Sequence, residues 1–466
     1  MMVRLALRNI SRNRRRSLTT ASLVGMGAAG LLLFGAFMIY IFSGLETGIV
    51  QAGGHLVVHR SGYFLFGPGN PAAYGIDDHE AVMREIRNDP ILRPMIRVAT
   101  PTQALVGIAG NFAGGASTSK TFFGIGVVGA DREKMRTWDE HGASRPYVPD
   151  NRLNDPNAAR GVIGRGVARI LGLCGKLRVP DCPDPEPRPN ASDPNGPPLD
   201  PALTALAQEE RSGEAAAVVG TYIELLSATA SGAPNIVSLE VAGVDTQMVK
   251  EIDDNHIALP LSLAQRLVYG RGEPKVTGLV LQLHHTRDVP DARARLTALI
   301  ETKHWPLEVR DFREMNPFFV QVTRMFDTIF LFLALIMGVI VLFAVVNTMT
   351  MNVLERTSEI GTIRAMGVRR ATIRHLFVLE GAILGGLGAT LGVAIAFAAI
   401  WLINHAGFRW MPPGHTDPIP FQLVWPTRPG LLLGTWCGLV AVATLASLLP
   451  ANRAARSRIV DALRHV

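Results

Sequence analysis

The residue patterns that support ATP hydrolysis or covalent catalysis are missing from this sequence of 466 residues. A phosphate-binding loop needs G-x-x-x-x-G-K-[ST], so that backbone N–H groups and the lysine hold the phosphates. The one Gly-Lys pair, Gly175-Lys176, has Ile170 where the motif needs its first glycine and Leu177 where it needs a hydroxyl. No G-x-S-x-G elbow and no H-E-x-x-H motif is present either. We therefore expect no catalytic residues and no cofactor in this chain.

Two histidine pairs come nearest to metal-ligand spacing. His284 and His285 are adjacent, and adjacent residues of a strand point to opposite faces, so they are poorly placed to share an ion. His55 and His59 share a strand face but lie far apart along it. We expect surface histidines and no metal site.

The polar segment at residues 355–367, ERTSEIGTIRAMG, has the spacing of a short helix. Apolar side chains recur at helical intervals, and Arg356 can reach Glu359 three positions away. Gly367 suits a C-terminal cap. A plain connector would need only a few polar residues. The pattern fits a helix resting on lipid headgroups and a docking helix for a cytosolic protein about equally well.

The chain contains four apolar stretches without Asp, Glu, Lys or Arg: residues 17–45, 328–354, 381–408 and 429–452. The polar segment at 355–367 lies between the second and the third. A bilayer core of ~30 Å needs about 20 helical residues, so each stretch is long enough to span it. In lipid every backbone group must be paired within the segment, which favours helices. The first stretch is about twice the length of a cleaved signal's apolar centre, so we expect an uncleaved anchor.

The arginines predict the orientation of these spans. Residues 1–16, 355–374 and 451–466 hold 15 of the 46 basic residues but only 3 of the 39 acidic ones. Basic residues accumulate on the cytoplasmic side, so both termini and the 355–367 segment are expected there, and residues 46–323 outside. Because these arginines adjoin the spans, we set nucleic-acid binding aside as the cause of the high pI. Residues 2–16 predict an amphipathic helix on the inner leaflet.

The large outer segment predicts a mixed α/β domain whose sheets are covered by helices on one face. GHLVVHRSGY, KTFFGIGVVGAD and the pair VVGTYIELLSATA/APNIVSLEVAGVD read as strands. GRGVARILGL and PLSLAQRLVYG read as helices, the second ended by Gly270. VTGLVLQLHH, DVPDARARLTALIE and LEVRDF predict a strand–helix–strand unit.

Cys174 and Cys182 flank the start of a proline-rich stretch, residues 179–201, with nine prolines in 23 residues. Such a stretch can form neither a helix nor a central strand, so we expect an exposed loop. An oxidising compartment favours a Cys174–Cys182 disulfide at its base. The alternatives are two free thiols or a metal pair. We expect Cys437, in the fourth span, to be a small packed side chain.

The third span carries four glycines on one helix face, which allow close helix packing in lipid: Gly381, Gly385, Gly388 and Gly392. This face can serve another span of the same chain or a second subunit. Glu380 precedes it by one residue and lies about 9 Å along a helix from Arg374. This keeps Glu380 near the inner interface, so we favour a plain interfacial charge over a proton relay.

The stretch NTMTMNVLERTSEIGTIRAMG resembles the coupling region of the MacB-like ABC permeases, which include the lipoprotein-release permeases LolC and LolE, MacB and FtsX. The N-terminal elbow helix of the family is similar to RLALRNISRNRRRSL of this chain. Parts of the family's outer domain are similar to three stretches, GRGVARILGL, LEVAGVD and PLSLAQRL, and its C-terminal tail is similar to LLPANRAARSRIVDALR. The resemblance covers most of the chain. The proline-rich insertion departs from the family's pattern.

The resemblance implies an α-helical membrane protein with four transmembrane helices and a large extracytoplasmic domain inserted between helices 1 and 2. It implies two paired permeases, identical or different, in the bacterial inner membrane, two cytosolic ATPase subunits that bind ATP and Mg, and contacts with lipid and a periplasmic partner. The ATPase would contact the coupling helix through Glu355, Arg356, Thr357, Glu359, Ile360, Gly361, Ile363, Arg364 and Gly367.

The expected segments are an elbow helix (1–16), a first span (17–45), a MacB-like periplasmic core domain (46–323), a second span (324–354), a coupling helix (355–372), a third span (373–404), an outer loop (405–428), a fourth span (429–450) and a cytoplasmic tail (451–466). The resemblance favours a transporter subunit that extracts or exports a lipoprotein, lipid or amphiphile. The alternative is an FtsX-like mechanotransmission subunit that regulates a periplasmic enzyme or sensor. A membrane-bound enzyme would need a catalytic set that this sequence lacks.

Overall fold

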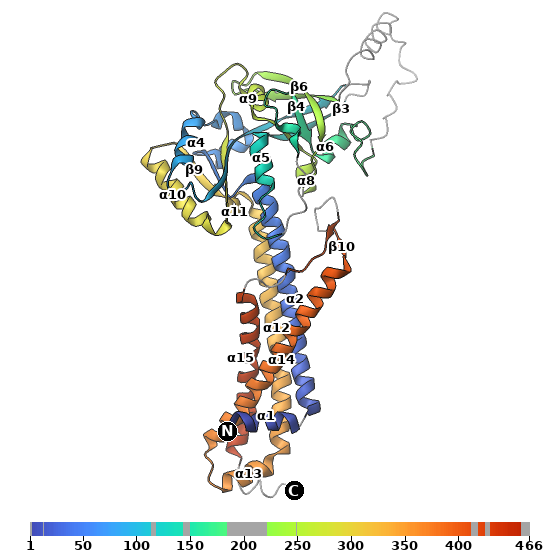
Figure 1. Ribbon diagram of the computed structural model, residues 1–466, viewed down its shortest axis with the longest axis vertical. Coiled ribbons are helices and arrows are strands. Elements are labelled where there is room, and N and C mark those ends of the chain that lie inside the picture. The colour runs from blue at the N-terminus through green and yellow to red at the C-terminus, as the bar shows by residue number, and fades with distance from the viewer. Residues whose placement is uncertain are drawn as a thin grey trace, which may run out of the picture. The chain divides into compact units, whose positions relative to one another are not determined.

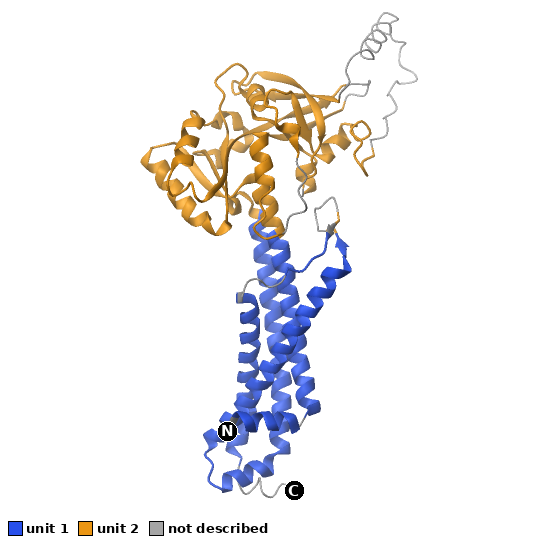
Figure 2. Cartoon of the chain, viewed as in Figure 1, with its two compact units in different colours: residues 1–43, 318–410, 419–466 blue, residues 44–317, 411–418 orange. Residues whose placement is uncertain are grey.

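The computed structural model describes residues 2–12, 14–112, 118–142, 150–183, 221–247, 249–411, 418–424 and 429–457. The chain forms two compact units (Figure 2). Unit 1 comprises residues 1–43, 318–410 and 419–466, and unit 2 comprises residues 44–317 and 411–418. The main segment of unit 2, residues 44–317, therefore begins in the last turns of the first long helix, α2 (Arg14–Gly53), and ends where the second, α12 (Pro317–Glu355), begins.

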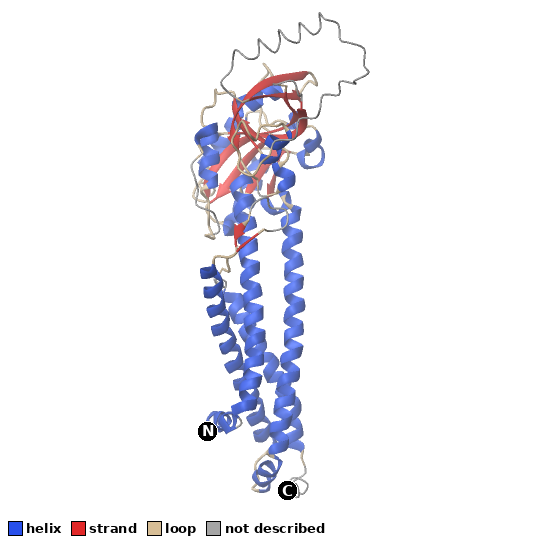
Figure 3. Ribbon diagram, turned by 90° about the vertical axis from the view of Figure 1, so that its right-hand side faces the viewer, coloured by secondary structure: helices blue, strands red, loops and turns tan. Residues whose placement is uncertain are grey.

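Unit 1 is helical apart from the two-residue strands β10 (Arg409–Trp410) and β11 (Ile419–Pro420) (Figure 3). Besides parts of α2 and α12 it contains α1 (Met2–Arg12), α13 (Thr357–Ala365), α14 (Arg370–Ala406) and α15 (Pro429–Arg456). In the described part of the chain, four helices are long and apolar enough to cross a membrane: α2, α12, α14 and α15. The four predicted spans lie within these helices, as expected of a multi-pass membrane protein.

Side chains from all four long helices meet in one apolar core of unit 1. Val24 of α2, Val345 of α12, Leu384 of α14 and Ala443 of α15 are all members of it. The α12 helix is the least covered of the four, with 11% of its most apolar window buried, against 28–44% for the others. Most of its apolar side chains outside this core are therefore at least partly exposed, as expected of a helix that contacts lipid or another subunit.

The glycine face of α14 packs against its own chain. A Cβ added to Gly381 or Gly385 would meet Ser447 or Ala443 of α15. A Cβ added to Gly388 or Gly392 would meet α2 instead, at Val24 and Ala28 respectively. The face is thus occupied by α15 and α2, the first of the two uses that the spacing left open.

Unit 2 is built on a nine-stranded sheet in the order β3-β7-β4-β6-β5-β2-β8-β1-β9 (Figure 1). The additional pairing of β3 with β2 closes the first six strands into a barrel. The strand bounds are β1 (Leu56–Arg60), β2 (Ile96–Asn111), β3 (Thr118–Val127), β4 (Arg160–Ile163), β5 (Tyr222–Ala228), β6 (Pro234–Val244), β7 (His256–Pro260), β8 (Gly278–Leu283) and β9 (Leu307–Asp311). β2 is long enough, at 16 residues, to pair in both the barrel and the remaining sheet.

Among the described residues of unit 2, the α-helices that follow α2 are α3 (Tyr63–Phe66), α4 (His79–Asn88), α5 (Gly129–Arg136), α6 (Arg165–Ile170), α8 (Lys250–Asp253), α9 (Leu261–Tyr269), α10 (Val289–Thr302) and α11 (Phe312–Met315). The predicted strand–helix–strand unit is β8–α10–β9, and β1 pairs between its two strands. The predicted strand pair is the β5–β6 hairpin.

Strands β8, β1 and β9, which lie outside the barrel, form the open part of the sheet. Helices cover both of its faces, so the prediction that helices cover only one face is wrong. Leu56 and Leu281 pack with the α4 and α10 side chains on one face. Val57 and Val280 point the other way and pack against Met135 of α5. Alternation along each strand thus supplies two apolar faces, each of which needs a cover.

Candidate functional site

The segment with the strongest sequence signal forms α13, and its C-terminal end has the expected glycine. Gly367 takes a φ of 90°, in the left-handed region that glycine enters without strain. The N–H of Gly367 donates to the Arg364 carbonyl at 3.0 Å, and that of Met366 to the Thr362 carbonyl at 3.1 Å. These bonds satisfy carbonyls that the helix end would otherwise leave unpaired.

One face of α13 is buried against unit 1. Ile360 is 6% exposed and packs with Ile373 and Phe377 of α14 and with Ala451 and Ala454 of α15. Gly361, the next residue, is also buried. These contacts hold α13 on the ends of two long helices.

Arg356, just before α13, is the polar counterpart of this anchor. Its guanidinium is 18% exposed and donates to Asn9 Oδ1 of α1 at 2.6 Å, to Glu359 Oε2 at 3.1 Å and to Glu380 Oε1 of α14 at 3.4 Å. Asn9 Nδ2 also donates to Glu380. One arginine therefore links α1, α13 and α14.

Further polar contacts surround this centre. Arg12 bonds Glu359 Oε1 at 2.8 Å, and this bond is the main reason that the pKa of Glu359 lies below its ordinary value. Arg16 pairs with Glu355. Arg364 donates to the Ser457 carbonyl after α15. The Thr357 hydroxyl donates back to the Val353 carbonyl at 3.0 Å.

The opposite face of α13 and the turn after it are exposed. Ile363 is 37% exposed and Met366 is 72% exposed, and Ser358 and Thr362 lie on the surface beside them. Of the nine residues predicted to contact a partner, Arg356, Ile360 and Gly361 thus face unit 1. Met366 was not among the nine predicted residues, although it follows Ile363 at helical spacing. Its side chain is the most exposed apolar one in this segment.

Glu380 is 2% exposed, so the charge expected near the inner interface is buried within the protein. Three elements enclose it: α14 itself, Asn9 of α1, and Arg356 before α13. No sequence pattern connects Asn9 with a residue 371 positions away.

His55 and His59 are buried, in contrast to the expected surface positions, whereas His284 and His285 are exposed as expected. His55 is 0% and His59 6% exposed. His55 Nδ1 accepts from the Leu283 N–H at 3.0 Å, and His59 Nδ1 donates to the Thr277 carbonyl at 2.5 Å. Burial lowers the pKa of each to about 4, so both rings are neutral and serve the packing. No group of three or more potential metal ligands gathers among the described residues.

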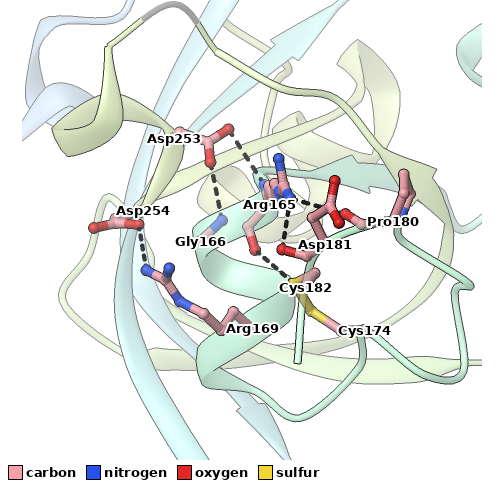
Figure 4. Close-up of a disulfide and its surroundings, with 9 residues drawn as sticks. All are labelled: Arg165, Gly166, Arg169, Cys174, Pro180, Asp181, Cys182, Asp253 and Asp254. Carbon is pink, nitrogen blue, oxygen red and sulfur yellow. Dashed lines mark hydrogen bonds and ion pairs between the residues drawn. A yellow bond between two sulfur atoms is a disulfide. The ribbon is translucent and has the colours of Figure 1, made fainter. Parts of the chain in front are cut away.

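Cys174 and Cys182 are joined by a disulfide beside α6, with their Cα atoms 5.6 Å apart (Figure 4). Arg165 of α6 donates to the carbonyls of Pro180 at 2.8 Å and Asp181 at 2.7 Å. The first residues of the proline-rich stretch are thus fixed to α6. The rest of that stretch, beyond residue 183, lies outside the described residues.

Comparison with known proteins places the membrane region in a recognised group. Residues 331–459 match the family model described as FtsX-like permease C-terminal. These residues include most of α12 and all of α13, α14 and α15. The match therefore covers α13 and its contacts with α14 and α15, but not α1.

The chain is 31% identical over 138 residues to the ABC transporter permease YtrF of Bacillus subtilis, covering 29% of this chain and 31% of that protein. It is 29% identical over 251 residues to the macrolide export ATP-binding/permease protein MacB of Hyphomonas neptunium, covering 53% of this chain and 35% of that protein. The matched regions thus span about a third of the length of these curated relatives.

One solved structure, the periplasmic region of MacB from Actinobacillus actinomycetemcomitans, aligns with 57% of this chain and 94% of its own length. The TM-score is 0.31 and the sequence identity 13%. At these values the likeness carries no argument about the fold of unit 2.

Proposed function

Because this chain is an ABC permease of the MacB/FtsX type, with residues 331–459 forming its FtsX-like permease region, we propose that it passes the energy of ATP hydrolysis from a cytosolic ATPase to unit 2. In this proposal unit 2 lies outside the inner membrane, and both chain termini lie in the cytoplasm. ATP and Mg are bound by a nucleotide-binding domain outside this sequence, since no phosphate-binding loop occurs in it.

The observation that carries the proposal is the exposed face of α13. A short helix between two membrane helices is held by Ile360 and Arg356 and presents Ile363 and Met366 to solvent. Exposed apolar side chains at a fixed position, rimmed by the polar Ser358 and Thr362, suit a protein–protein contact. The arginines of residues 1–16 and 451–466 support a cytoplasmic location for this end of unit 1.

The test is the recovery of an ABC ATPase with the tagged full-length permease, quantified by mass spectrometry and by ATP hydrolysis. The double variant Ile363→Asp/Met366→Asp should reduce the bound ATPase at least tenfold, because two carboxylates replace the apolar contact. Ile252→Asp makes the same change at an isoleucine of unit 2 that is 54% exposed and should leave binding unaltered. Equal ATPase recovery with all three proteins would refute the assignment of α13.

We propose a lipoprotein, lipid or other amphiphile as the substrate. Support comes from the uncovered face of α12, where Leu331, Phe332 and Phe343 are each more than 60% exposed. Two permeases that pair through or beside this face would enclose an apolar surface at membrane depth. The measurement is ATP-dependent release of a fluorescent lipidated peptide from proteoliposomes. ATP hydrolysis without any release, across lipids and lipopeptides, would favour mechanotransmission instead.

A further inference from the structure

Glu380 is an acidic side chain buried in a membrane helix at the point where three elements meet. Its carboxylate accepts from Asn9 Nδ2 of α1 and from Arg356 Nη1, the latter at 3.4 Å. Arg356 Nη2 donates in turn to Asn9 Oδ1 at 2.6 Å. The three side chains thus form a closed triangle, and each of them bonds both of the others.

A buried carboxylate is retained at such a place only if it is fully paired. Taking a charge out of water is costly, and removing one partner leaves the other charge uncompensated. The triangle therefore favours a single relative position of α1, α13 and α14. A shift of α13 alone would draw Arg356 away from Glu380 and leave the buried carboxylate unpaired, which is energetically unfavourable.

Two further ion pairs near the triangle are more exposed and contribute less. The side chains of Arg12 and Glu359 are 69% and 42% exposed, and those of Arg16 and Glu355 are 46% and 36% exposed. Exposed pairs are weak and are screened by salt. The buried triangle is the stronger link between α13 and the rest of unit 1.

The position of Glu380 along α14 determines which contacts of α14 a displacement of α13 would disturb first. The next residue, Gly381, begins the glycine face, and a Cβ added there would lie 3.2 Å from the Ala443 carbonyl of α15. The same face reaches α2 at Gly388 and Gly392. Movement of Glu380 therefore acts directly on the contacts that join α14 to its two neighbours.

We propose that Asn9, Arg356 and Glu380 form a positioning lock through which a displacement of α13 is delivered to α14 and α1 as one body. The inference rests on the proposed function only for the source of the displacement, the docked ATPase. Arg356 and Glu380 act here as positioning residues, and neither is required to touch the ATPase.

The first measurement uses the purified full-length permease without ATPase, followed by hydrogen–deuterium exchange. Glu380→Gln keeps the size of the side chain but removes its charge. It should raise exchange at least fivefold in α1 and α13. Arg374→Gln removes one exposed charge from the same helix and should change neither. Unaltered exchange in Glu380→Gln would overturn the lock, whatever the protein's function is.

The second measurement uses the complex with its ATPase, trapped with ATP and vanadate. In the wild type and in Arg374→Gln, trapping should change exchange in α13 and over residues 380–392. In Glu380→Gln and Arg356→Lys the ATPase should still be recovered and the change in α13 should remain. The change over residues 380–392 should fall at least fivefold. Transmission to residues 380–392 that persists in both variants would overturn the inference, whereas failure to recover an ATPase with the wild type would overturn the proposed function.

Discussion

Gly25 of α2 lies against Gly388 of α14, and a Cβ placed on Gly25 would come within 3.1 Å of the Gly388 carbonyl oxygen. In the reverse direction, a Cβ on Gly388 would lie 2.6 Å from Val24 Cβ and 2.8 Å from the Ala21 carbonyl oxygen. Both positions must therefore be glycine for the two backbones to approach this closely. Such close packing matters in lipid, where no hydrophobic force holds helices together.

Gly388→Ala should destabilise the permease by about 1–3 kcal/mol, because the added methyl overlaps the α2 backbone and must push the helices apart. The readout is the thermal unfolding midpoint of the full chain in detergent. Gly386→Ala is the matched control two residues away, where the added Cβ would meet only Trp436 at 3.9 Å. That variant should be neutral or gain up to ~1 kcal/mol from helix propensity. Equal effects of the two substitutions would contradict the packing described here.

The elements that could be predicted from the sequence depend on short-range patterns. The four spans follow from uninterrupted apolar runs, the β5–β6 hairpin from two adjacent β-rich runs, and α9 from its periodicity and Gly270. Features that depend on distant segments could not be predicted. The parallel pairing of β3 with the distant β7, and the pairing of Asn9 with Glu380, leave no periodic signal.

The same limit explains the errors. His59 was expected on the surface, but Tyr63, four residues further on, stacks on its ring at 4.1 Å. For α13, periodicity predicted the helix, and the family resemblance predicted its contact residues, among them the exposed Ile363. Which of its polar residues face inward depends on α1 and α14, which are far away in the chain.

Unit 2 should lose stability as the pH falls below neutrality. Burial holds the pKa of His59 at about 4, below its ordinary value of 6.5, so the folded state favours the neutral ring. The unfolded chain takes up the proton below pH 6.5 and the folded chain only near pH 4. Stability is therefore complete above pH 6.5 and falls between 6.5 and 4, by up to ~3 kcal/mol for His59. The thermal midpoint of the full chain between pH 7.5 and 5 measures this loss.

His59→Asn should make that pH dependence shallower, because the amide can donate to the Thr277 carbonyl and does not titrate. His55 and His256, whose pKa values burial also lowers to about 4, keep part of the slope. The slope should drop by about a third. His304→Asn, at an exposed position with φ 54° that asparagine tolerates, should leave it unchanged. A full slope in His59→Asn would exclude His59 as a source.

The Cys174–Cys182 disulfide should be found in native protein by non-reducing peptide mapping. It closes a short loop over a separation of eight residues, beside the buried core that contains Cys174. Replacing both cysteines by serine should lower the stability of unit 2 by about 2–3 kcal/mol, through the added freedom of the unfolded loop and the loss of buried sulfur. Cys437→Ser removes the third cysteine and serves as the control. Two alkylatable thiols at positions 174 and 182 in native protein would contradict the pairing.

Asp253 and Asp254 offer a matched pair of substitutions beside that disulfide (Figure 4). Asp253 is 1% exposed, and its carboxylate accepts from the backbone N–H groups of Arg165 at 3.2 Å, Gly166 at 3.0 Å and Gln247 at 2.8 Å. Asp253→Asn turns an NH2 group toward at least one of these donors and should cost about 1–3 kcal/mol.

Asp254 bonds only the exposed side chains of Arg169, at 3.3 Å, and Lys250, at 2.7 Å, so Asp254→Asn should cost less than ~1 kcal/mol. High salt should weaken the wild-type Asp254 pairs and leave the difference caused by Asp253→Asn nearly unchanged, because buried bonds are little screened. The free energy of unfolding of the full chain at low and high salt gives both comparisons. A larger loss in Asp254→Asn than in Asp253→Asn would show that the surface pairs, and not the buried carboxylate, hold α6 to the segment around α8.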